Sequence, residues 1–288
     1  MTCHVCVVVH TPAHSQVSGP LTYGSVQPLA PGTLVRVPLG KRETLGVVWD
    51  TDPHAPPPPD SMDVKPVASV LDALAPLPAA WRELVAFSAR YYQRSLGEVA
   101  LAALPPQLRD LGVEQLARRL KRVKETPPAA PNTTDLIALS AEQQSAIGQF
   151  DAENGPFLLF GATGSGKTEV YLRCVQRVLD ADPAAQALVM VPEINLTPQL
   201  EARFHARFGA DSVVSLHSGM TNPQRLRSWL AAHSGAARIV LGTRMAVFAS
   251  MPSLRLIIVD EEHDPSYKQQ EGARYSARDL AVYRGRLE

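Results

Sequence analysis

The segment from Gly161 to Thr168 (GATGSGKT) constrains the fold of this 288-residue chain more than any other feature. Its spacing is G-x-x-x-x-G-K-[ST], in which backbone N–H groups of a glycine-rich loop turn inward around phosphate oxygens. The apolar run Phe157–Phe160 before it predicts a buried strand, and a helix is expected to begin at its end. A strand, a phosphate loop and a helix in this order predict a parallel α/β sheet that binds a nucleotide.

All eight residues of this loop are candidate nucleotide contacts. We expect Lys167 to reach the β- and γ-phosphates and the Thr168 hydroxyl to bind Mg²⁺. The remaining members contribute mainly through their backbone: Gly161, Ala162, Thr163, Gly164, Ser165 and Gly166. The strand and helix context makes a glycine-rich turn without a ligand a poor alternative.

An acidic motif follows the apolar run Leu256–Val259, at the end of a predicted strand. In α/β proteins ligands bind at the carboxyl ends of parallel strands. We expect Asp260 to hold Mg²⁺ through water, and Glu261 to orient and deprotonate the attacking water. His263 is a candidate sensor of the γ-phosphate or a relay from it toward the DNA contacts. Together the loop and the acidic motif predict an NTPase.

Short apolar runs alternate with helical segments through the C-terminal part, which is typical of a parallel sheet wrapped by helices. The runs cover residues 187–191, 212–216, 238–241 and 256–259. Residues 191–199 and the triplet Gly242-Thr243-Arg244 follow two of these strands. Their hydroxyls, backbone amides and one arginine suit phosphate contacts along a nucleic-acid strand, so Thr243 and Arg244 are candidate DNA contacts.

Gln143 precedes the phosphate loop by one predicted helix and has two interpretations. Its amide suits bidentate recognition of adenine. With Ser140 it also fits a capping box, which needs no ligand. Both roles are compatible.

The segment from Asp264 to Asp279 mixes aromatic, basic and amide residues without regular periodicity. Tyrosines in such a loop can stack unpaired bases while basic side chains neutralise phosphates. The candidate DNA contacts are Tyr267, Lys268, Arg274 and Tyr275. The alternative is a surface loop before a helix capped by Ser276.

The N-terminal part predicts a small β-rich domain with a helix packed behind it. Residues 33–37 and 44–49 read as strands of a hairpin with a longer loop around Gly40, and apolar residues of 79–92 recur at helical spacing. Proline clusters at 54–59 and 126–134 predict an exposed loop and an interdomain linker. A helix over 108–124 has a basic face, which is either solvated or in contact with phosphates.

Composition narrows the function only slightly. Lys+Arg and Asp+Glu number 28 each, so any DNA contact depends on local patches rather than on net charge. Three cysteines cannot form a disulfide framework, which favours a reducing cytoplasm. Cys3 and Cys6 point to opposite faces of a predicted strand, which argues against a metal or redox pair. No apolar run is long enough for a membrane span.

The motifs together resemble the PriA family of replication-restart helicases (primosomal protein N′, superfamily 2). The resemblance covers nearly all of residues 136–288, through GATGSGKTEVYL, ALVMVPEINLTPQL, LHSGM, GTR, DEEHDPSYKQQEG and RYSARDLAVYR. It implies a RecA-like lobe that uses ATP and Mg²⁺ for 3′-to-5′ unwinding at stalled forks. Forked and single-stranded DNA, primosome proteins and single-strand-binding proteins are the implied partners, and the loop after Asp260 is the implied aromatic-rich coupling loop.

GTLVRVPLGKRETLGVV, together with ALP near residue 104, is similar to the 3′-end-binding domain of that family. The implied pocket for a 3′ terminus maps to Leu21, Thr22, Gly40 and Lys65. The family usually has Phe-Asp where this chain has Leu21-Thr22, so a carboxylate acceptor for the 3′-OH is absent. The expected domains are therefore a 3′-end-binding domain (1–105), a basic helix and linker with the winged helix reduced or absent (106–135), and helicase lobe 1 (136–288).

The family's second motor lobe, arginine finger and zinc-binding cysteines have no counterpart in these 288 residues. Zinc is expected in the family's remaining sequence, and no zinc ligands are expected here. Superfamily 2 motors hydrolyse ATP between two lobes, so this chain alone is expected to bind ATP weakly and not to translocate. Two alternatives stay open: a fork-binding module with a vestigial nucleotide site, and a superfamily 2 translocase on duplex DNA or RNA.

Overall fold

The structure, a computed structural model, describes residues 3–11, 19–50, 64–124, 138–153, 155–162, 164–193 and 197–288. The loop expected at 54–59, the linker at 126–134, Thr163 and residues 194–196 lie outside the described residues. None of the helices in the described part of the chain combines the length and the apolar character that crossing a membrane requires.

The N-terminal half contains a five-stranded antiparallel sheet in the order β2-β1-β4-β3-β5. Its strands are β1 (Cys3–Val9), β2 (Leu21–Ser25), β3 (Leu34–Leu39), β4 (Arg42–Val48) and β5 (Ser69–Val70). Branched apolar side chains, among them Val7, Val35 and Val37, fill a small core of its own. The predicted β-rich domain is therefore present, and Cys3 and Cys6 lie on β1 as expected.

The turn between β3 and β4 is tighter than the longer loop predicted around Gly40. Leu39 pairs with Arg42, so only Gly40 and Lys41 connect the strands. Gly40 has φ +62°, a value that two-residue hairpins require and that glycine adopts without strain. The predicted loop is too long because Pro38, Arg42 and Glu43 lack the apolar pattern of a strand, although they pair in register.

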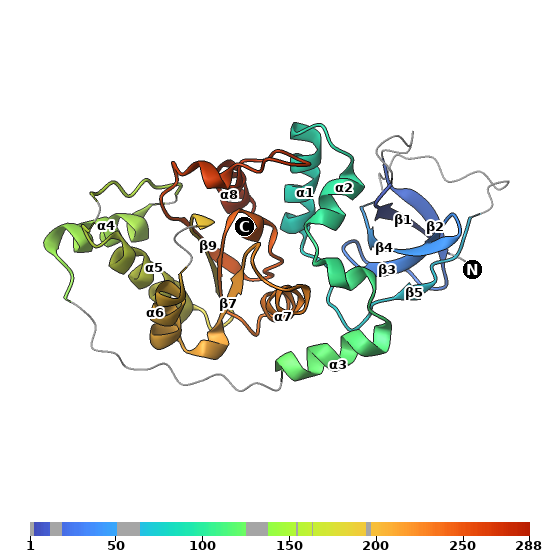
Figure 1. Cartoon of the computed structure of the whole chain (residues 1–288), viewed down its shortest axis with the longest axis horizontal. Coiled ribbons are helices and arrows are strands. Elements are labelled where there is room, and N and C mark those ends of the chain that lie inside the picture. The colour runs from blue at the N-terminus through green and yellow to red at the C-terminus, as the bar shows by residue number, and fades with distance from the viewer. Residues whose placement is uncertain are drawn as a thin grey trace.

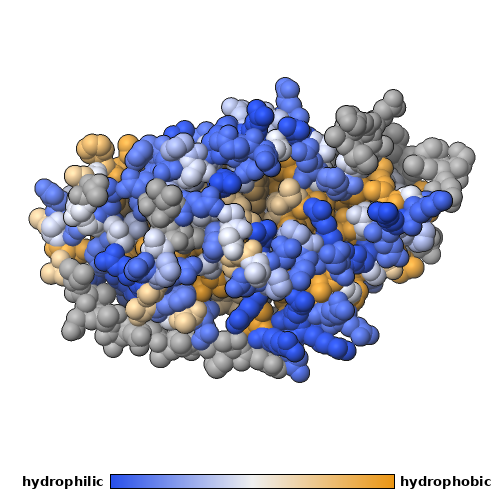
Figure 2. Space-filling model, in the orientation of Figure 1, coloured by the Kyte–Doolittle hydropathy of each residue, from blue (hydrophilic) through white to orange (hydrophobic). Residues whose placement is uncertain are grey.

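Three helices follow the sheet: α1 (Ala79–Tyr91), α2 (Leu96–Ala102) and α3 (Val113–Lys124), with a short 3-10 turn η1 (Pro106–Arg109) between the last two. In Figure 1 α1 and α2 stand between the two sheets of the molecule. The helix predicted over 108–124 begins only at Val113, because residues before it form η1. Leu116 and Leu120 are buried and α3 packs against α7 (Asn222–His233). Figure 2 shows hydrophilic residues over α3, and Arg118, Lys121 and Arg122 are exposed.

The C-terminal half holds a four-stranded parallel sheet in the order β7-β8-β6-β9. The strands are β6 (Gln186–Met190), β7 (Val213–Leu216), β8 (Ile239–Gly242) and β9 (Leu254–Val259). The other elements are α4 (Ala141–Ala152), α5 (Lys167–Ala181), α6 (Pro198–Phe208), α8 (Ala277–Leu287) and the short turns η3 (Ala210–Ser212), η4 (Arg244–Phe248) and η5 (Pro265–Tyr267). The predicted parallel α/β lobe is confirmed, with strand limits shifted by one or two residues.

One predicted strand of this lobe is wrong. Residues 157–160 form no strand, and β9 pairs only with β6 among the described residues. Phe160 is 93% exposed and Leu158 75% exposed, although their apolar character predicted burial. A strand exists only where a neighbouring strand accepts its hydrogen bonds, and hydrophobicity alone does not supply that partner.

Successive side chains of β6 point to opposite faces of the parallel sheet, and each face packs into its own hydrophobic core. Ala187 and Val189 join a core with α5 and α6. Leu188 and Met190 join a larger core that contains residues of α7, α8 and also α1, α2 and α3. The N-terminal helices therefore share a hydrophobic core with the parallel sheet.

Two polar contacts cross between the halves inside this core. The Trp81 indole N–H donates to the Phe248 carbonyl oxygen at 2.8 Å. His233 Nε2 lies 2.9 Å from the Ala75 carbonyl oxygen, and its Nδ1 lies 2.8 Å from Ser250 Oγ. Because a carbonyl oxygen only accepts, His233 carries its proton on Nε2 and accepts from Ser250.

This histidine makes stability depend on pH. Burial lowers the pKa of His233 to about 4, whereas the unfolded side chain titrates near 6.5. The unfolded state therefore binds more protons between these values, and the free energy of unfolding should fall as pH drops from about 6.5 to about 4. The expected loss is about 3 kcal/mol, reached near pH 4.

Urea unfolding of the wild type and of His233→Gln across this range measures the effect. Glutamine keeps an N–H donor but does not titrate, so the difference between the two proteins should shrink as pH falls. A difference that stays constant from pH 7 to pH 4 would contradict the assignment.

Candidate active site

The phosphate loop leads into α5, as predicted, although residues 157–160 directly before it form no strand. Gly164 and Gly166 have φ of +83° and +82°, left-handed values that other residues rarely adopt. A Cβ on Gly166 would meet the side-chain amide of Gln143, which would have to shift. Gly166 caps α5, so the N–H groups of the first helical turn face the loop, an arrangement that favours a bound anion.

Lys167 is held at the centre of this loop. Its Nζ donates to the Gly161 carbonyl oxygen at 2.7 Å and lies 3.8 Å from Glu261 Oε1. The loop at residues 161–168 and the acidic motif at residues 260–263, separated by about ninety positions, are therefore brought together as predicted. A γ-phosphate bound by Lys167 would consequently lie beside the carboxylate that is expected to act as base.

The two residues expected to bind Mg²⁺ also converge. Asp260 follows β9, and its backbone N–H donates to the Met190 carbonyl oxygen at 2.8 Å, which fixes its position at the sheet edge. Tyr171 lies within hydrogen-bonding reach of both Thr168 and Asp260. Burial and the Glu261 charge raise the pKa of Asp260. A divalent cation between Thr168 and Asp260 would offset that unfavourable negative charge, so the donors present fit Mg²⁺.

Tyr171 was missed in the sequence, and its spacing is the signal that points to it. It lies three residues after Thr168 on α5, so both occupy the same face of the helix. Burial raises the pKa of Tyr171 to about 12, so its hydroxyl stays protonated and can orient Asp260.

Gln143 carries out the structural role expected of it. Ser140 and Gln143 form a complete capping box at the start of α4. Gln143 Nε2 also lies 3.4 Å from the carbonyl oxygens of Ser165 and Gly166, so the helix cap contacts the phosphate loop. His263 is 75% exposed, and its Nε2 lies 3.8 Å from Glu261 Oε2, at the edge of the same site.

The candidate DNA contacts of the lobe lie within or close to the loop at residues 264–279. Arg244 Nε donates to Gln269 Oε1 at 2.7 Å, and Arg244 Nη1 lies 3.3 Å from Glu193 Oε2. Thr243 is buried, and its backbone N–H donates to the Leu216 carbonyl oxygen. Lys268 lies over the Tyr92 ring at 5.5 Å, while Arg274 is exposed. Ser276 caps α8 as predicted.

The expectation that Tyr267 stacks a base needs correction. Tyr267 is 2% exposed, and its hydroxyl donates to the Asp260 carbonyl oxygen at 2.7 Å. Tyr275 contacts Phe248 edge to face at 5.1 Å, and burial raises its pKa to about 12. A tyrosine gains more from burying its ring and bonding its hydroxyl than from exposure. Tyr267 thus connects the loop to the acidic motif instead of presenting a surface for a base.

The residues of the implied 3′-end pocket lie around β2. Leu21 and Thr22 belong to β2 and pair with Val7 and Cys6 of β1. The Gly24 N–H donates to the Lys65 carbonyl oxygen at 2.9 Å, so the Lys65 segment runs beside this strand.

The turn at Gly40 is connected to the same strand. The Tyr23 hydroxyl donates to the Pro38 carbonyl oxygen at 3.0 Å, two residues before Gly40. The structure therefore places Leu21 and Thr22 on β2 and brings the segments that contain Lys65 and Gly40 into contact with the same strand. As for metals, the described residues contain no cluster of three His, Cys, Asp or Glu side chains that suits an ion.

Each half of the chain matches the model of a known protein family. Residues 6–105 match the model of the PriA 3′ DNA-binding domain, and residues 140–285 match the model of DEAD/DEAH box helicases. The helicase match alone covers half of the chain.

Curated relatives give the same result. The chain is 35% identical to the replication restart protein PriA of Haemophilus influenzae over 322 positions, which cover 87% of this chain and 43% of the relative. It is 32% identical to the PriA of Rickettsia felis over 257 positions, covering 89% of this chain and 37% of the relative. A shorter stretch is 47% identical to the PriA of Chlamydia pneumoniae, over 52% of this chain and 20% of the relative.

The chain thus spans less than half the length of these relatives. Its phosphate loop, its acidic motif and its N-terminal sheet lie in the regions that the two family models match. The chain belongs to the DEAD/DEAH box helicase family, within the group of the replication restart proteins PriA.

Proposed function

We propose that this chain forms the fork-binding and ATP-binding part of a 3′-to-5′ DNA helicase that acts in the cytoplasm during replication restart. The N-terminal sheet would bind a 3′ end at a stalled fork, and the lobe would bind ATP, Mg²⁺ and single-stranded DNA. Primosome proteins and single-strand-binding proteins are the proposed partners. Zinc is proposed only for sequence that lies outside these residues.

The observation that carries this proposal is the direct contact between the loop at residues 264–279 and the acidic motif. The Tyr267 hydroxyl bonds the Asp260 carbonyl oxygen, and Arg244 bonds Gln269 of the same loop. Movement of the loop on binding DNA would consequently move Asp260. A motor requires this coupling between a nucleic-acid contact and a hydrolytic residue, whereas a passive DNA-binding module does not.

The proposed chemistry follows from the residues around the phosphate loop. Lys167 and backbone N–H groups neutralise phosphate charge, and Thr168 and Asp260 hold Mg²⁺, which supplies further charge stabilisation when bound. Glu261 lies beside Lys167, where it can orient a water molecule and accept its proton. Glu261 has φ +45°, a strained value for this residue type, as found at functional sites.

ATP hydrolysis by the complete helicase, with and without forked DNA, tests the proposal. We expect strong stimulation by the fork, and unwinding of a duplex with a 3′ single-stranded tail but not one with a 5′ tail. Fork binding with no hydrolysis would favour a DNA-binding module with a vestigial nucleotide site. Hydrolysis without strand separation would favour a duplex translocase.

A second expectation concerns the 3′ end. Thr22 replaces the carboxylate whose hydrogen bond to a 3′-OH would contribute about 1.5–3 kcal/mol. Oligonucleotides ending in a 3′-OH or a 3′-phosphate should therefore bind with affinities that differ by less than about tenfold. Fluorescence anisotropy measures both, and Thr22→Asp should increase the preference for the hydroxyl. A strong preference in the wild type would show that the pocket selects without a carboxylate.

A further inference from the structure

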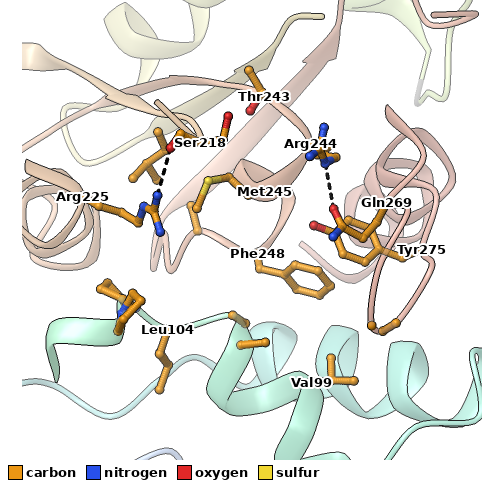
Figure 3. Close-up of a pocket in the computed structure, with 18 of the residues that line it drawn as sticks. Val99, Leu104, Ser218, Arg225, Thr243, Arg244, Met245, Phe248, Gln269 and Tyr275 are labelled. Carbon is orange, nitrogen blue, oxygen red and sulfur yellow. Dashed lines mark hydrogen bonds between the residues drawn. The ribbon is translucent and has the colours of Figure 1, made fainter. Parts of the chain in front are cut away.

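A cavity of about 490 Å³ lies between the N-terminal helices and the parallel-sheet lobe (Figure 3). One wall comes from α2 and the residues after it, including Val99 and Leu104. The opposite wall comes from α7, from η4 and from the loop that contains Gln269. Its volume lies in the range of sites that enclose one small molecule or one nucleotide unit.

The lining combines apolar surface with two cations. Figure 3 shows Met245 and Phe248 in the middle of the lobe-side wall, with Arg225 and Arg244 on either side of them. A flat apolar group fits between Phe248 and the α2 side, and an anionic group fits against a guanidinium.

Two hydrogen-bond donors at this cavity lack acceptors. Arg225 Nε and Trp229 Nε1 are buried and have no partner within the described residues. Within the described part of the chain, the contacts of Arg225 Nη2 are long, 3.3 Å to the Ser218 carbonyl oxygen and 3.5 Å to that of Met220. Buried polar groups are nearly always paired, so unpaired donors here indicate a ligand rich in acceptors. The loosely held Arg225 guanidinium needs only a small shift to reach one.

Two carboxylates that line the cavity indicate where the anionic part of a ligand would lie. Glu98 belongs to α2, where it pairs with Arg94 at 3.8 Å, and Glu271 belongs to the loop. Negative charge is therefore disfavoured beside α2 and beside the loop tip, and favoured beside Arg225 on α7.

We propose that this cavity binds one unstacked base of single-stranded DNA, with the base between the apolar walls and a flanking phosphate on Arg225. The inference rests on the proposed function, because that function supplies the single strand. A base bound in the cavity would contact Gln269, which accepts a hydrogen bond from Arg244. The loop that contains Gln269 also contains Tyr267, whose hydroxyl donates to the Asp260 carbonyl oxygen. A base in the cavity would thereby be sensed at the nucleotide site.

Photocrosslinking identifies the occupant directly. The 288-residue chain is irradiated with an oligo-dT in which 5-iododeoxyuridine replaces some thymidines, and crosslinked peptides are mapped by mass spectrometry. We expect crosslinks at the aromatic residues of the cavity, chiefly Phe248. Ala103→Trp, which fills the cavity from the α2 side, should remove these crosslinks and weaken oligo-dT binding roughly tenfold, the effect of losing one stacked base.

A second set of variants does not depend on filling the cavity. Arg225→Gln should weaken binding and make it less sensitive to salt, while Arg225→Lys should retain much of the affinity because it keeps the charge. Arg227→Gln is the matched control: it removes the same charge from an exposed position of α7 outside the cavity. Circular dichroism verifies that each variant folds.

Two results would overturn the inference, and they are distinguishable. If oligo-dT binds the wild type, but crosslinks fall outside the cavity and both Ala103→Trp and Arg225→Gln bind normally, the cavity takes no base while the proposed function stands. If the wild type does not bind oligo-dT at all, the cavity proposal fails together with the DNA-binding function on which it rests.

Discussion

Lys167→Ala is expected to lower ATP hydrolysis by the complete helicase by roughly two to three orders of magnitude, while DNA binding stays largely intact. Lys167 is the cation at the centre of the phosphate loop, 2.7 Å from the Gly161 carbonyl oxygen and 3.8 Å from Glu261. Its removal leaves the developing charge on the γ-phosphate without its nearest side-chain partner. Steady-state hydrolysis and fork-binding anisotropy, measured on the same preparations, give the two quantities.

Arg177→Ala is the matched control for this experiment. Arg177 lies on α5 like Lys167, but it is exposed, and among the described residues its salt-bridge partner is Asp151. An exposed ion pair contributes little to stability, so this variant should hydrolyse ATP at the wild-type rate. Equal losses of hydrolysis and DNA binding in Lys167→Ala would show that the nucleotide and DNA sites are not separable as proposed.

Trp81→Ala should lower the free energy of unfolding by about 3–5 kcal/mol. Trp81 is fully buried on α1, in the core that the N-terminal helices share with the parallel sheet. Its removal leaves a cavity and deprives the Phe248 carbonyl oxygen of its donor. Urea unfolding followed by circular dichroism measures the loss.

Trp81→Phe separates the two contributions. Phenylalanine keeps most of the buried ring surface but cannot donate to Phe248, so it should cost much less than alanine, about 1–2 kcal/mol. Arg90→Ala, a change at an exposed position of the same helix, should have a small effect. A loss below about 1 kcal/mol in Trp81→Ala would contradict the shared core.

The active-site motifs could be predicted from sequence because each is a short contiguous segment with its own chemistry. The glycine spacing of residues 161–168 and the acidic residues after β9 needed no knowledge of long-range contacts. The acidic motif follows β9 as predicted, and Lys167 and Glu261 lie 3.8 Å apart, although residues 157–160 before the phosphate loop form no strand. Tyr171 was missed, since a tyrosine on a helix has no distinctive pattern until its neighbours are known.

The aromatic loop shows where such prediction fails. Composition indicated exposed tyrosines, but Tyr267 is buried with its hydroxyl on the Asp260 backbone. Nothing local distinguishes a tyrosine that stacks a base from one that anchors a loop. The prediction of a strand at residues 157–160 was wrong for a related reason. Their apolar composition indicated a strand, but a strand forms only beside a partner strand, which distant sequence must supply.

The amino-acid sequence by itself determined the nucleotide chemistry, the parallel sheet and the β-rich N-terminal domain, because these depend on local spacing and on the periodicity of apolar residues. Only the tertiary structure decided that α1, α2 and α3 share a core with the lobe, that Trp81 and His233 bond across the two halves, and that a cavity with unpaired donors lies between them. Contacts between residues more than a hundred positions apart arise from the packing of whole elements. A one-dimensional pattern does not encode which faces of those elements meet.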